Sequence, residues 1–305
     1  MNAFPAARDA GLATIEIPGV TPWRRGKVRD VYGAGDQLVV VASDRLSAYD
    51  SILPTPIPDK GRILTALSAH WFRTLRGARP HHLLSTERAD LPEPFRSIEA
   101  LEGRTMLCAR AERVDVECVV RGYLTGAGYR EYRTSGTLHG EKLPTGLADG
   151  ARLDRPRFTP TTKAEEGHDL PIALADLPGV VGADLARELA FRSHALYEEA
   201  HDRALAAGLV LADTKLEFGF VDGKLTLIDE LLSPDSSRYW DRSEYGRGRL
   251  VSFDKQYVRD WLDDSGWDHQ PPAPALPAEV VTRTRDRYLE AARRLMGAEA
   301  EVLWR

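Results

Sequence analysis

Two carboxylates lie on the two arms of one predicted β-hairpin. Glu217 belongs to the stretch LADTKLEFGF and Asp229 to KLTLIDELLS, and the Asp-Gly step between them is a strong hairpin signal. Apolar and polar residues alternate in both stretches, which predicts two antiparallel strands. Paired strands bring carboxylates together, and carboxylate oxygens are ligands that Mg²⁺ prefers. The pattern predicts a magnesium site for phosphate chemistry; the alternative is two solvated acids on an edge strand.

A shared ion imposes a register on this hairpin. A two-residue turn at the Asp-Gly step would place Glu217 opposite Ile228, and the pleat would turn Asp229 to the other face. A three-residue loop ending at Lys224 would instead set Glu217 opposite Asp229. Because both carboxylates must reach one ion, we predict the three-residue loop, or a bulge. A two-residue hairpin without a bulge would contradict the argument.

Several segments carry cations or hydroxyls suited to an anionic ligand. On a strand, Lys27 and Arg29 in GKVRD would face the same side and could hold a polyphosphate. Lys255 and Arg259 are four residues apart and would share one face of a helix. Each segment alone also fits a solvated turn, a helix cap or surface charge pairing. The other segments of this kind are SDRLSAYD at 43–50, RGY and GAG at 121–128, the polar stretch FTPTTKAEEGHD, and DSSR at 235–238.

Composition excludes several classes of protein. The 305 residues include 41 Lys and Arg against 46 Asp and Glu, so the charge of −5 gives no electrostatic footprint for nucleic acid. No stretch approaches the roughly 20 apolar residues that span a bilayer, and the first residues lack the pattern of a signal peptide. Cys108 and Cys118 have no metal-ligand spacing. We therefore expect a cytoplasmic protein with small-molecule partners, neither nucleic acid nor membrane, that is a monomer or homodimer.

Hydrophobic periodicity predicts mixed secondary structure. Strands are expected at 37–43 and twice within 106–124, before the hairpin. Helices are expected within 59–76, 183–207 and 254–262, and again after Pro277. The range 134–171 is rich in Gly, Pro, Thr and charge, has no sustained period and is expected to be a long functional loop. Its His168 is interpreted as solvated rather than catalytic. Strands first and helices later indicate an α+β fold.

Taken together, the segments resemble the phosphoribosylaminoimidazole-succinocarboxamide synthase (SAICAR synthase) family. The resemblance spans about residues 24 to 262 and rests on GKVRDVY, SDRLSAYD, DKGRILT, ECVVRGYLTGAGY, FTPTTKAEEGHD, LADTKLEFGF, LIDELLSPDSSRYW and SFDKQYVRDWL, in the family's order. It implies ATP-dependent condensation of carboxyaminoimidazole ribonucleotide with L-aspartate to SAICAR, ADP and phosphate, through an acyl phosphate. It also implies an ATP-grasp-related fold, with a β-rich domain at 1–120 and a larger α+β domain at 121–305, the boundary being near Arg121.

The resemblance also assigns residues. It implies that the ATP site includes Lys27, Val28, Arg29, Glu117 and Val119, and that Mg²⁺ is bound by Glu217 and Asp229. It implies a ribonucleotide site made of Asp44, Ser47, Arg121, Asp235, Arg238, Lys255 and Arg259, with Lys163 on a lid. No catalytic residue or proton acceptor is identified, although Lys27, Arg121 and Lys255 are candidates for electrostatic stabilisation.

One residue departs from the family pattern. Ala127 stands where the family's loop is expected to hold a Ser between two glycines, so backbone amides or Thr125 would have to replace that hydroxyl.

Two rival functions remain. A small-molecule kinase would not form a product that depends on aspartate, and an inactive nucleotide-binding module would not release ADP.

Overall fold

The computed structural model describes residues 4, 6–163 and 170–304. Its first sheet is antiparallel with the strand order β1-β2-β3-β7-β6. The strands are β1 (Arg24–Arg25), β2 (Arg29–Ala34), β3 (Gln37–Ala42), β6 (Leu83–Ser85) and β7 (Thr105–Ala109). A small hairpin of β4 (Ser47–Ala48) and β5 (Ser51–Ile52) follows β3. The apolar run at 37–43 therefore forms a central strand, as predicted.

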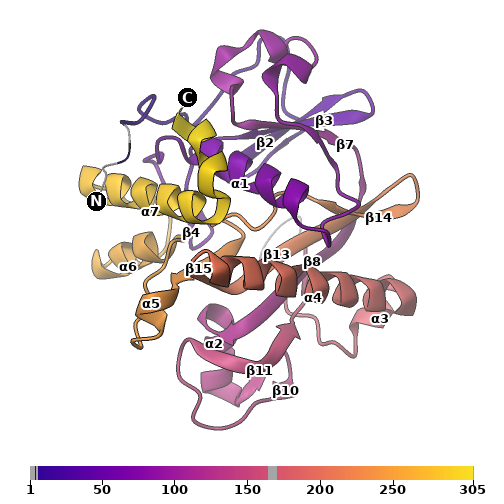
Figure 1. The fold of residues 1–305 in the computed structure, drawn as a ribbon, viewed down its shortest axis with the longest axis vertical. Helices are drawn as coiled ribbons and strands as arrows, with labels where there is room; N and C mark the ends of the chain where they lie inside the picture. Colours follow the sequence, from indigo (N-terminus) through magenta and orange to yellow (C-terminus); the bar gives the residue numbers. More distant parts are fainter. Residues whose placement is uncertain (1–3, 5, 164–169, 305) are drawn as a thin grey trace.

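The second sheet is built around two long neighbouring strands, β8 (Glu112–Leu124) and β13 (Leu209–Val221). Its order is β11-β8-β13-β14, with β12 also paired to β8 and β15 to β13. The outer strands are β11 (Ala151–Phe158), β12 (Thr161–Thr162), β14 (Lys224–Ile228) and β15 (Ser237–Asp241). Helix α4 (Ala183–Ala206) lies across this sheet and packs mainly on β13 and β8 (Figure 1).

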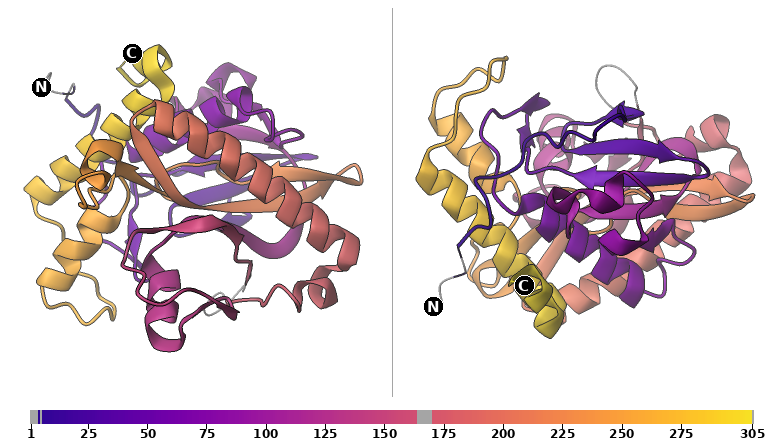
Figure 2. Two further views of the ribbon diagram at one scale, coloured as in Figure 1. Left: turned by 60° about the horizontal axis from the view of Figure 1, so that its bottom comes forward. Right: turned by 90° about the horizontal axis from the view of Figure 1, so that it is seen from above.

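Helices from distant parts of the chain join the two sheets. Helix α1 (Lys60–Thr74) packs on β3 and β7 and also against α7 (Ala278–Met296), which lies beside it in Figures 1 and 2. Helix α6 (Gln256–Asp264) packs on α7 in turn. The remaining helices are α2 (Gly126–Ser135), α3 (Leu177–Val181) and α5 (Arg242–Tyr245), with the 3₁₀ turns η1 (Arg88–Asp90), η2 (Phe95–Ser97), η3 (Glu99–Leu101) and η4 (Gly297–Trp304). The α+β class and the main helices were predicted correctly.

The prediction of a long structureless loop at 134–171 is wrong. The described part of that range contains β9 (Thr137–Leu138), β10 (Glu141–Lys142), β11 and β12. Strand β11 is an edge strand with a bulge between Arg152 and Arg157. Arg152, Asp154 and Arg155 are exposed, and Pro156 lacks an N–H, which only an edge position tolerates. Because of these residues, the sequence does not show the alternation of apolar and polar side chains that predicts a strand.

The chain passes from one sheet to the other between β7 and β8. Arg121 lies inside β8, which is a single strand of the second sheet. We therefore propose that the two halves of the chain divide at residues 110–111, rather than near Arg121. Helix α7 comes from the second half but returns to pack on α1, and α6 packs on α7.

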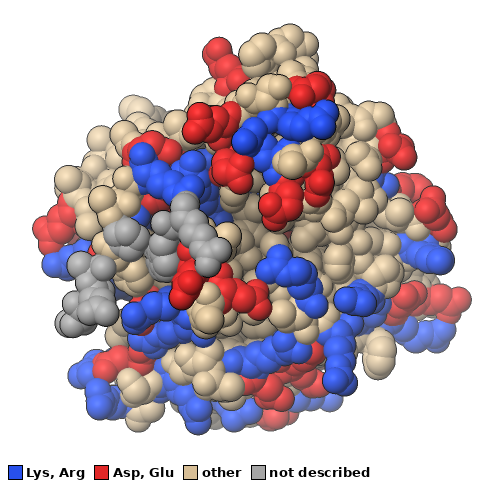
Figure 3. Space-filling model, turned by 45° about the horizontal axis from the view of Figure 1, so that its top comes forward, with Lys and Arg blue, Asp and Glu red and all other residues tan. Residues whose placement is uncertain are grey.

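The surface shows mixed charge. Basic and acidic side chains are interspersed on the face drawn in Figure 3, without a field of one sign. Within the described ranges, none of the helices has both the length and the apolar character needed to cross a bilayer.

Candidate active site

The hairpin that carries the two predicted metal ligands has a two-residue turn. Val221 pairs with Lys224 and Glu217 pairs with Ile228, without a register shift between β13 and β14. The predicted three-residue loop is therefore wrong. Asp222 adopts a positive φ of 49°, which the Asp-Gly step permits, so local turn chemistry decided the register.

Asp229 contacts the guanidinium group of Arg29 instead. Strand β14 ends at Ile228, and Asp229 has a φ of 65°, so the strand pleat does not set its direction. Asp229 Oδ1 lies 2.8 Å from Arg29 Nη1. Burial would lower the pKa of Arg29, but Asp229, Glu230 and, more weakly, Glu217 outweigh burial and raise it. The register argument for a shared ion fails: Asp229 pairs with Arg29, whereas Glu217 pairs with Lys163 and Lys215.

A ladder of polar side chains runs along β8 and β13. On β13, Asp213 and Glu217 lie directly opposite Arg121 and Glu117 of β8. The facing glutamates would repel, but Lys215 Nζ donates to both, at 2.8 Å from Glu117 and 2.6 Å from Glu217. Burial would lower the pKa of Lys215, yet these two carboxylates raise it. The ladder thus keeps several charges ionised inside the protein.

Asp213 and Lys215 were missed in the sequence. Both alternate with Glu217 in DTKLE, and the period of two puts all three on one face of a strand. Lys163 also pairs with Glu217, and with Lys215 it holds the pKa of the Glu217 carboxyl below its usual range against the effect of burial. The structure therefore joins the predicted lid lysine to the predicted metal ligand.

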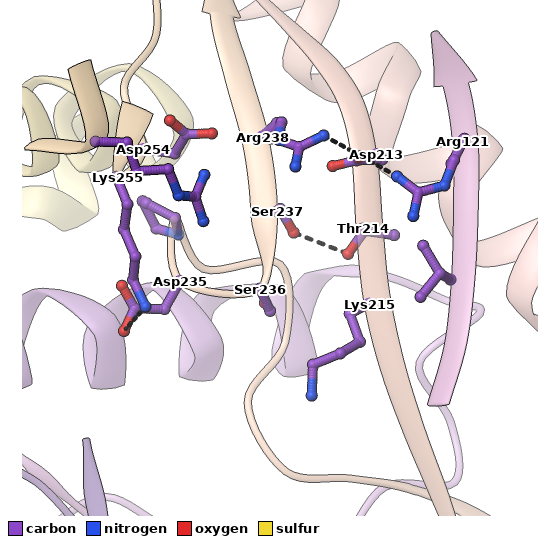
Figure 4. A pocket seen from close by; sticks show the side chains of 13 residues that line it. Arg121, Asp213, Thr214, Lys215, Asp235, Ser236, Ser237, Arg238, Asp254 and Lys255 are labelled. Atoms are coloured by element: carbon purple, nitrogen blue, oxygen red, sulfur yellow. Dashed lines mark hydrogen bonds and ion pairs between the residues drawn. The ribbon is translucent and has the colours of Figure 1, made fainter. Parts of the chain in front are cut away.

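A cavity of about 170 Å³ opens beside this ladder. Arg121 Nη1 and Arg238 Nη1 each donate to Asp213 Oδ2 at 2.8 Å, and Figure 4 shows both guanidinium groups directed at that carboxylate. The lining brings together most of the predicted ribonucleotide residues, namely Arg121, Asp235, Arg238, Lys255 and Arg259, with Val119 of the predicted ATP site and with Asp213, Thr214, Lys215, Pro234, Ser236, Ser237 and Asp254. These cations suit an anionic substrate.

Asp235 lines this cavity, and both of its oxygens have partners within the protein. Its Oδ2 lies 2.7 Å from Lys60 Nζ and 3.3 Å from Lys255 Nζ, and its Oδ1 accepts from the Tyr288 hydroxyl. Burial would raise the pKa of Asp235, but Lys255 and Lys60 lower it. Asp235 therefore positions Lys255. Lys60 has no exposed surface, and the sequence analysis assigned it no role although it lies in DKGRILT.

A larger cavity of about 740 Å³ adjoins the first and shares Arg238, Lys255 and Arg259 with it. Lys27 and Ser47 lie on its wall, together with Thr125, Gly126 and Ala127 at the start of α2. Gly126 has a φ of 57°, and a Cβ there would collide with the Arg238 guanidinium. The glycine therefore lets Arg238 approach the helix, and Thr125 stands where it could replace the hydroxyl lacking at Ala127.

Asp44 and Lys27 do not lie where the sequence predicted them. Asp44 is fully buried outside both cavities, where it accepts from the backbone N–H groups of Leu12 and Gly61 and pairs with Arg104. Lys27 lies in the turn before β2 rather than on a strand, so it does not share a strand face with Arg29 as predicted.

Two more of the assigned residues, Val28 and Glu117, have hydrogen-bond partners within the protein. The Val28 carbonyl accepts from Ser43, and Glu117 accepts from Thr161 as well as Lys215. The part of the lid at 164–169, with His168, lies outside the described residues.

Glu217 on β13 and Asp229 just after β14 are the carboxylates predicted for a hard cation, and each is paired with basic side chains in this structure. Within the described residues, no group of three or more His, Cys, Asp or Glu side chains is arranged to hold an ion by itself. Mg²⁺ is commonly bound by one or two carboxylates together with phosphate oxygens of a substrate. Glu217 and Asp229 would supply such carboxylates, with Glu230 close to the same guanidinium.

Comparison with known proteins agrees with this geometry. The family model described as SAICAR synthetase matches residues 22–274. The chain belongs to the SAICAR synthetase family. The phosphoribosylaminoimidazole-succinocarboxamide synthases of Thermodesulfovibrio yellowstonii and Salinispora arenicola are 47% and 50% identical to it, over 91% and 89% of this chain and 96% of each relative.

A solved structure of this family has the same fold. The SAICAR synthase from Saccharomyces cerevisiae complexed with SAICAR is 37% identical and superposes with a TM-score of 0.83, covering 94% of this chain and 98% of that one. The α+β architecture of the family is therefore that of this chain, as the sequence resemblance implied.

Proposed function

We propose that the chain is an ATP-dependent ligase that condenses carboxyaminoimidazole ribonucleotide with L-aspartate, giving SAICAR, ADP and phosphate in purine biosynthesis. One observation carries the proposal: a cavity lined by four basic side chains lies beside the ladder of polar side chains on β8 and β13. The four are Arg121, Arg238, Lys255 and Arg259. The high identity to curated synthases over nearly the whole chain supports it.

The residues divide into two groups by charge. The cations of the cavity neutralise the phosphate and carboxylate of the ribonucleotide, because a buried anion needs a charge partner. Lys27 and Arg29 hold the ATP phosphates, and Glu117 and Val119 lie beside the adenine. Glu217 and Asp229 bind Mg²⁺, which supplies charge neutralisation on transferring phosphate. These roles follow from residue chemistry and the resemblance.

The chemistry requires activation of a carboxylate. A carboxylate is a poor acylating agent because its leaving group would be oxide. Transfer of the γ-phosphoryl group to the ribonucleotide carboxylate forms an acyl phosphate and releases ADP. The aspartate amine then forms the amide bond, phosphate leaves and the amine loses a proton. Since both steps move negative charge, the chain contributes mainly positioning and electrostatic stabilisation.

The assay that tests the proposal combines ATP, Mg²⁺ and the ribonucleotide, with and without aspartate. We expect an amide product and the release of ADP over many turnovers, both of which depend on aspartate. A phosphorylated product that accumulates over many turnovers without aspartate would support a kinase instead, and no ADP with all substrates present would support an inactive binding module.

Lys255→Met should raise the KM for the ribonucleotide by about 10- to 100-fold, the effect of a lost hydrogen bond to a charged group, while the KM for ATP changes little. Lys255 lines both cavities, and burial lowers the pKa of its ammonium group although Asp235 acts against that. Steady-state kinetics with each substrate varied would measure this. Lys224→Met, at the exposed hairpin tip, is the control. Equal effects on both KM values would contradict the assignment.

Two further proposals concern its setting. We place the protein in the cytoplasm, since Cys108 and Cys118 are buried free thiols, which a reducing compartment permits. Its partners are the small substrates.

A further inference from the structure

One carboxylate in the smaller cavity has an oxygen without a partner. Asp254 is only 3% exposed and lines this cavity. Its Oδ1 accepts from the backbone N–H of Gln256 at 2.7 Å, at the start of α6, whereas its buried Oδ2 has no hydrogen-bond partner. Burial raises the pKa of Asp254, although Arg238 and Arg259 act in the opposite direction.

The other two carboxylates of the cavity differ from Asp254 in this respect. Asp213 Oδ2 accepts from both Arg121 and Arg238, and Asp235 is bonded to Lys60, Lys255 and Tyr288. A buried acceptor without a donor is costly, so proteins seldom retain one without a use. A ligand that fills the cavity would supply the missing donor.

The position of Asp254 limits which ligand group that is. In the view of Figure 4, Asp254 lies beside Arg238, while Lys215 lies at the opposite end beyond Ser237 and Thr214. Lys215 contacts Glu217, the proposed metal ligand, so the carboxylate to be activated and the aspartate amine belong at that end. Arg238 and Arg259 lead into the larger cavity. The part of the ribonucleotide beside Asp254 is therefore its ribose phosphate.

A carboxylate repels phosphate but accepts hydrogen bonds from hydroxyl groups. The ribose hydroxyls are the donors of the ribose phosphate. We propose that Asp254 accepts a hydrogen bond from a ribose hydroxyl and so determines specificity for a ribonucleotide over a deoxyribonucleotide. This inference rests on the proposed function and names a contact of the same site. A site built to hydrogen-bond a hydroxyl rejects an analogue that lacks it, because its polar group is then left unpaired.

The test compares the ribonucleotide with its 2′-deoxy and 3′-deoxy analogues in the wild type and in Asp254→Ser. A serine at position 254 can still accept from Gln256 N–H but offers no second oxygen. Asp264→Ser, at the exposed end of α6, the helix that follows Asp254, is the matched control.

We expect the wild type to use at least one analogue about 10- to 100-fold less efficiently in kcat/KM, the range for a hydrogen bond to a charged group. Asp254→Ser should lower kcat/KM for the ribonucleotide by a similar factor and leave that analogue within about 3-fold of its wild-type value, because the two changes remove the same interaction. The KM values for ATP and aspartate should stay within about 3-fold.

Three outcomes would overturn the inference while leaving the proposed function in place. These are a wild type that uses both analogues as well as the ribonucleotide, an Asp254→Ser enzyme that loses the same factor with all three, and a variant whose main change is a raised KM for aspartate. The last would assign Asp254 to the aspartate ammonium. A wild type that forms no aspartate-dependent product would reject the proposed function, and the inference with it.

Discussion

Asp229→Asn should lower kcat by on the order of 100- to 1000-fold without unfolding the protein, because a lost metal ligand removes several kcal/mol of charge stabilisation. The substitution removes a negative charge and almost no volume. Arg29 keeps an ion pair with Glu230 at 3.1 Å, so its guanidinium group is not left without a partner. Turnover at increasing Mg²⁺ and far-UV circular dichroism would measure activity and fold separately.

The same hairpin provides the control. Asp222→Asn makes the same chemical change at an exposed turn residue whose positive φ Asn also tolerates, so it should leave kcat unchanged. Near-normal turnover of Asp229→Asn at saturating Mg²⁺ would reject Asp229 as a metal ligand. A comparable loss in both variants would mean that the hairpin itself, and not the carboxylate, was damaged.

Local patterns in the sequence predicted the elements but not the register of this hairpin. The alternation in both arms and the Asp-Gly step are properties of neighbouring residues, and they identified β13 and β14 correctly. The direction of Asp229 depends on its left-handed backbone just after β14, which side-chain periodicity does not report. Assuming a continued pleat led to the wrong loop length.

The same distinction applies to the cation cavity. Asp213 and Lys215 were predictable, because they share a strand face with Glu217 at a period of two. Lys60 and Tyr288 were not, since they reach Asp235 only where α1 and α7 pack together, and the residues are 175 and 53 positions away from it in the chain. Contacts between distant elements leave no local pattern.

Asp44, in contrast, was predicted to belong to the substrate site and lies outside it. Its place among polar residues after a strand indicated a ligand contact, but the structure uses both of its oxygens to bind backbone N–H groups and Arg104. A polar residue at a strand end serves the ligand only if the surrounding backbone leaves it unpaired, and the sequence alone does not show that.

Asp235→Asn should destabilise the protein by roughly 3–5 kcal/mol, the effect of breaking a buried ion pair from one side. Lys60 has no exposed surface, and the substitution would leave its ammonium group without a carboxylate. Urea unfolding of the protein without substrates would measure the loss. A residue that only contacted the ribonucleotide would change KM and leave the free energy of unfolding almost unaltered, so the measurement separates the two roles.

Two further variants sharpen this measurement. Asp184→Asn breaks an exposed pair with Arg187 on α4 and should change the free energy of unfolding by less than about 1 kcal/mol. The double variant Lys60→Met with Asp235→Asn removes both buried charges and should recover part of the loss, because the unpaired ammonium group is then gone. If the double variant is less stable than Asp235→Asn by the full effect of Lys60→Met alone, the two residues are not coupled and Asp235 does not position the cations of the cavity through Lys60.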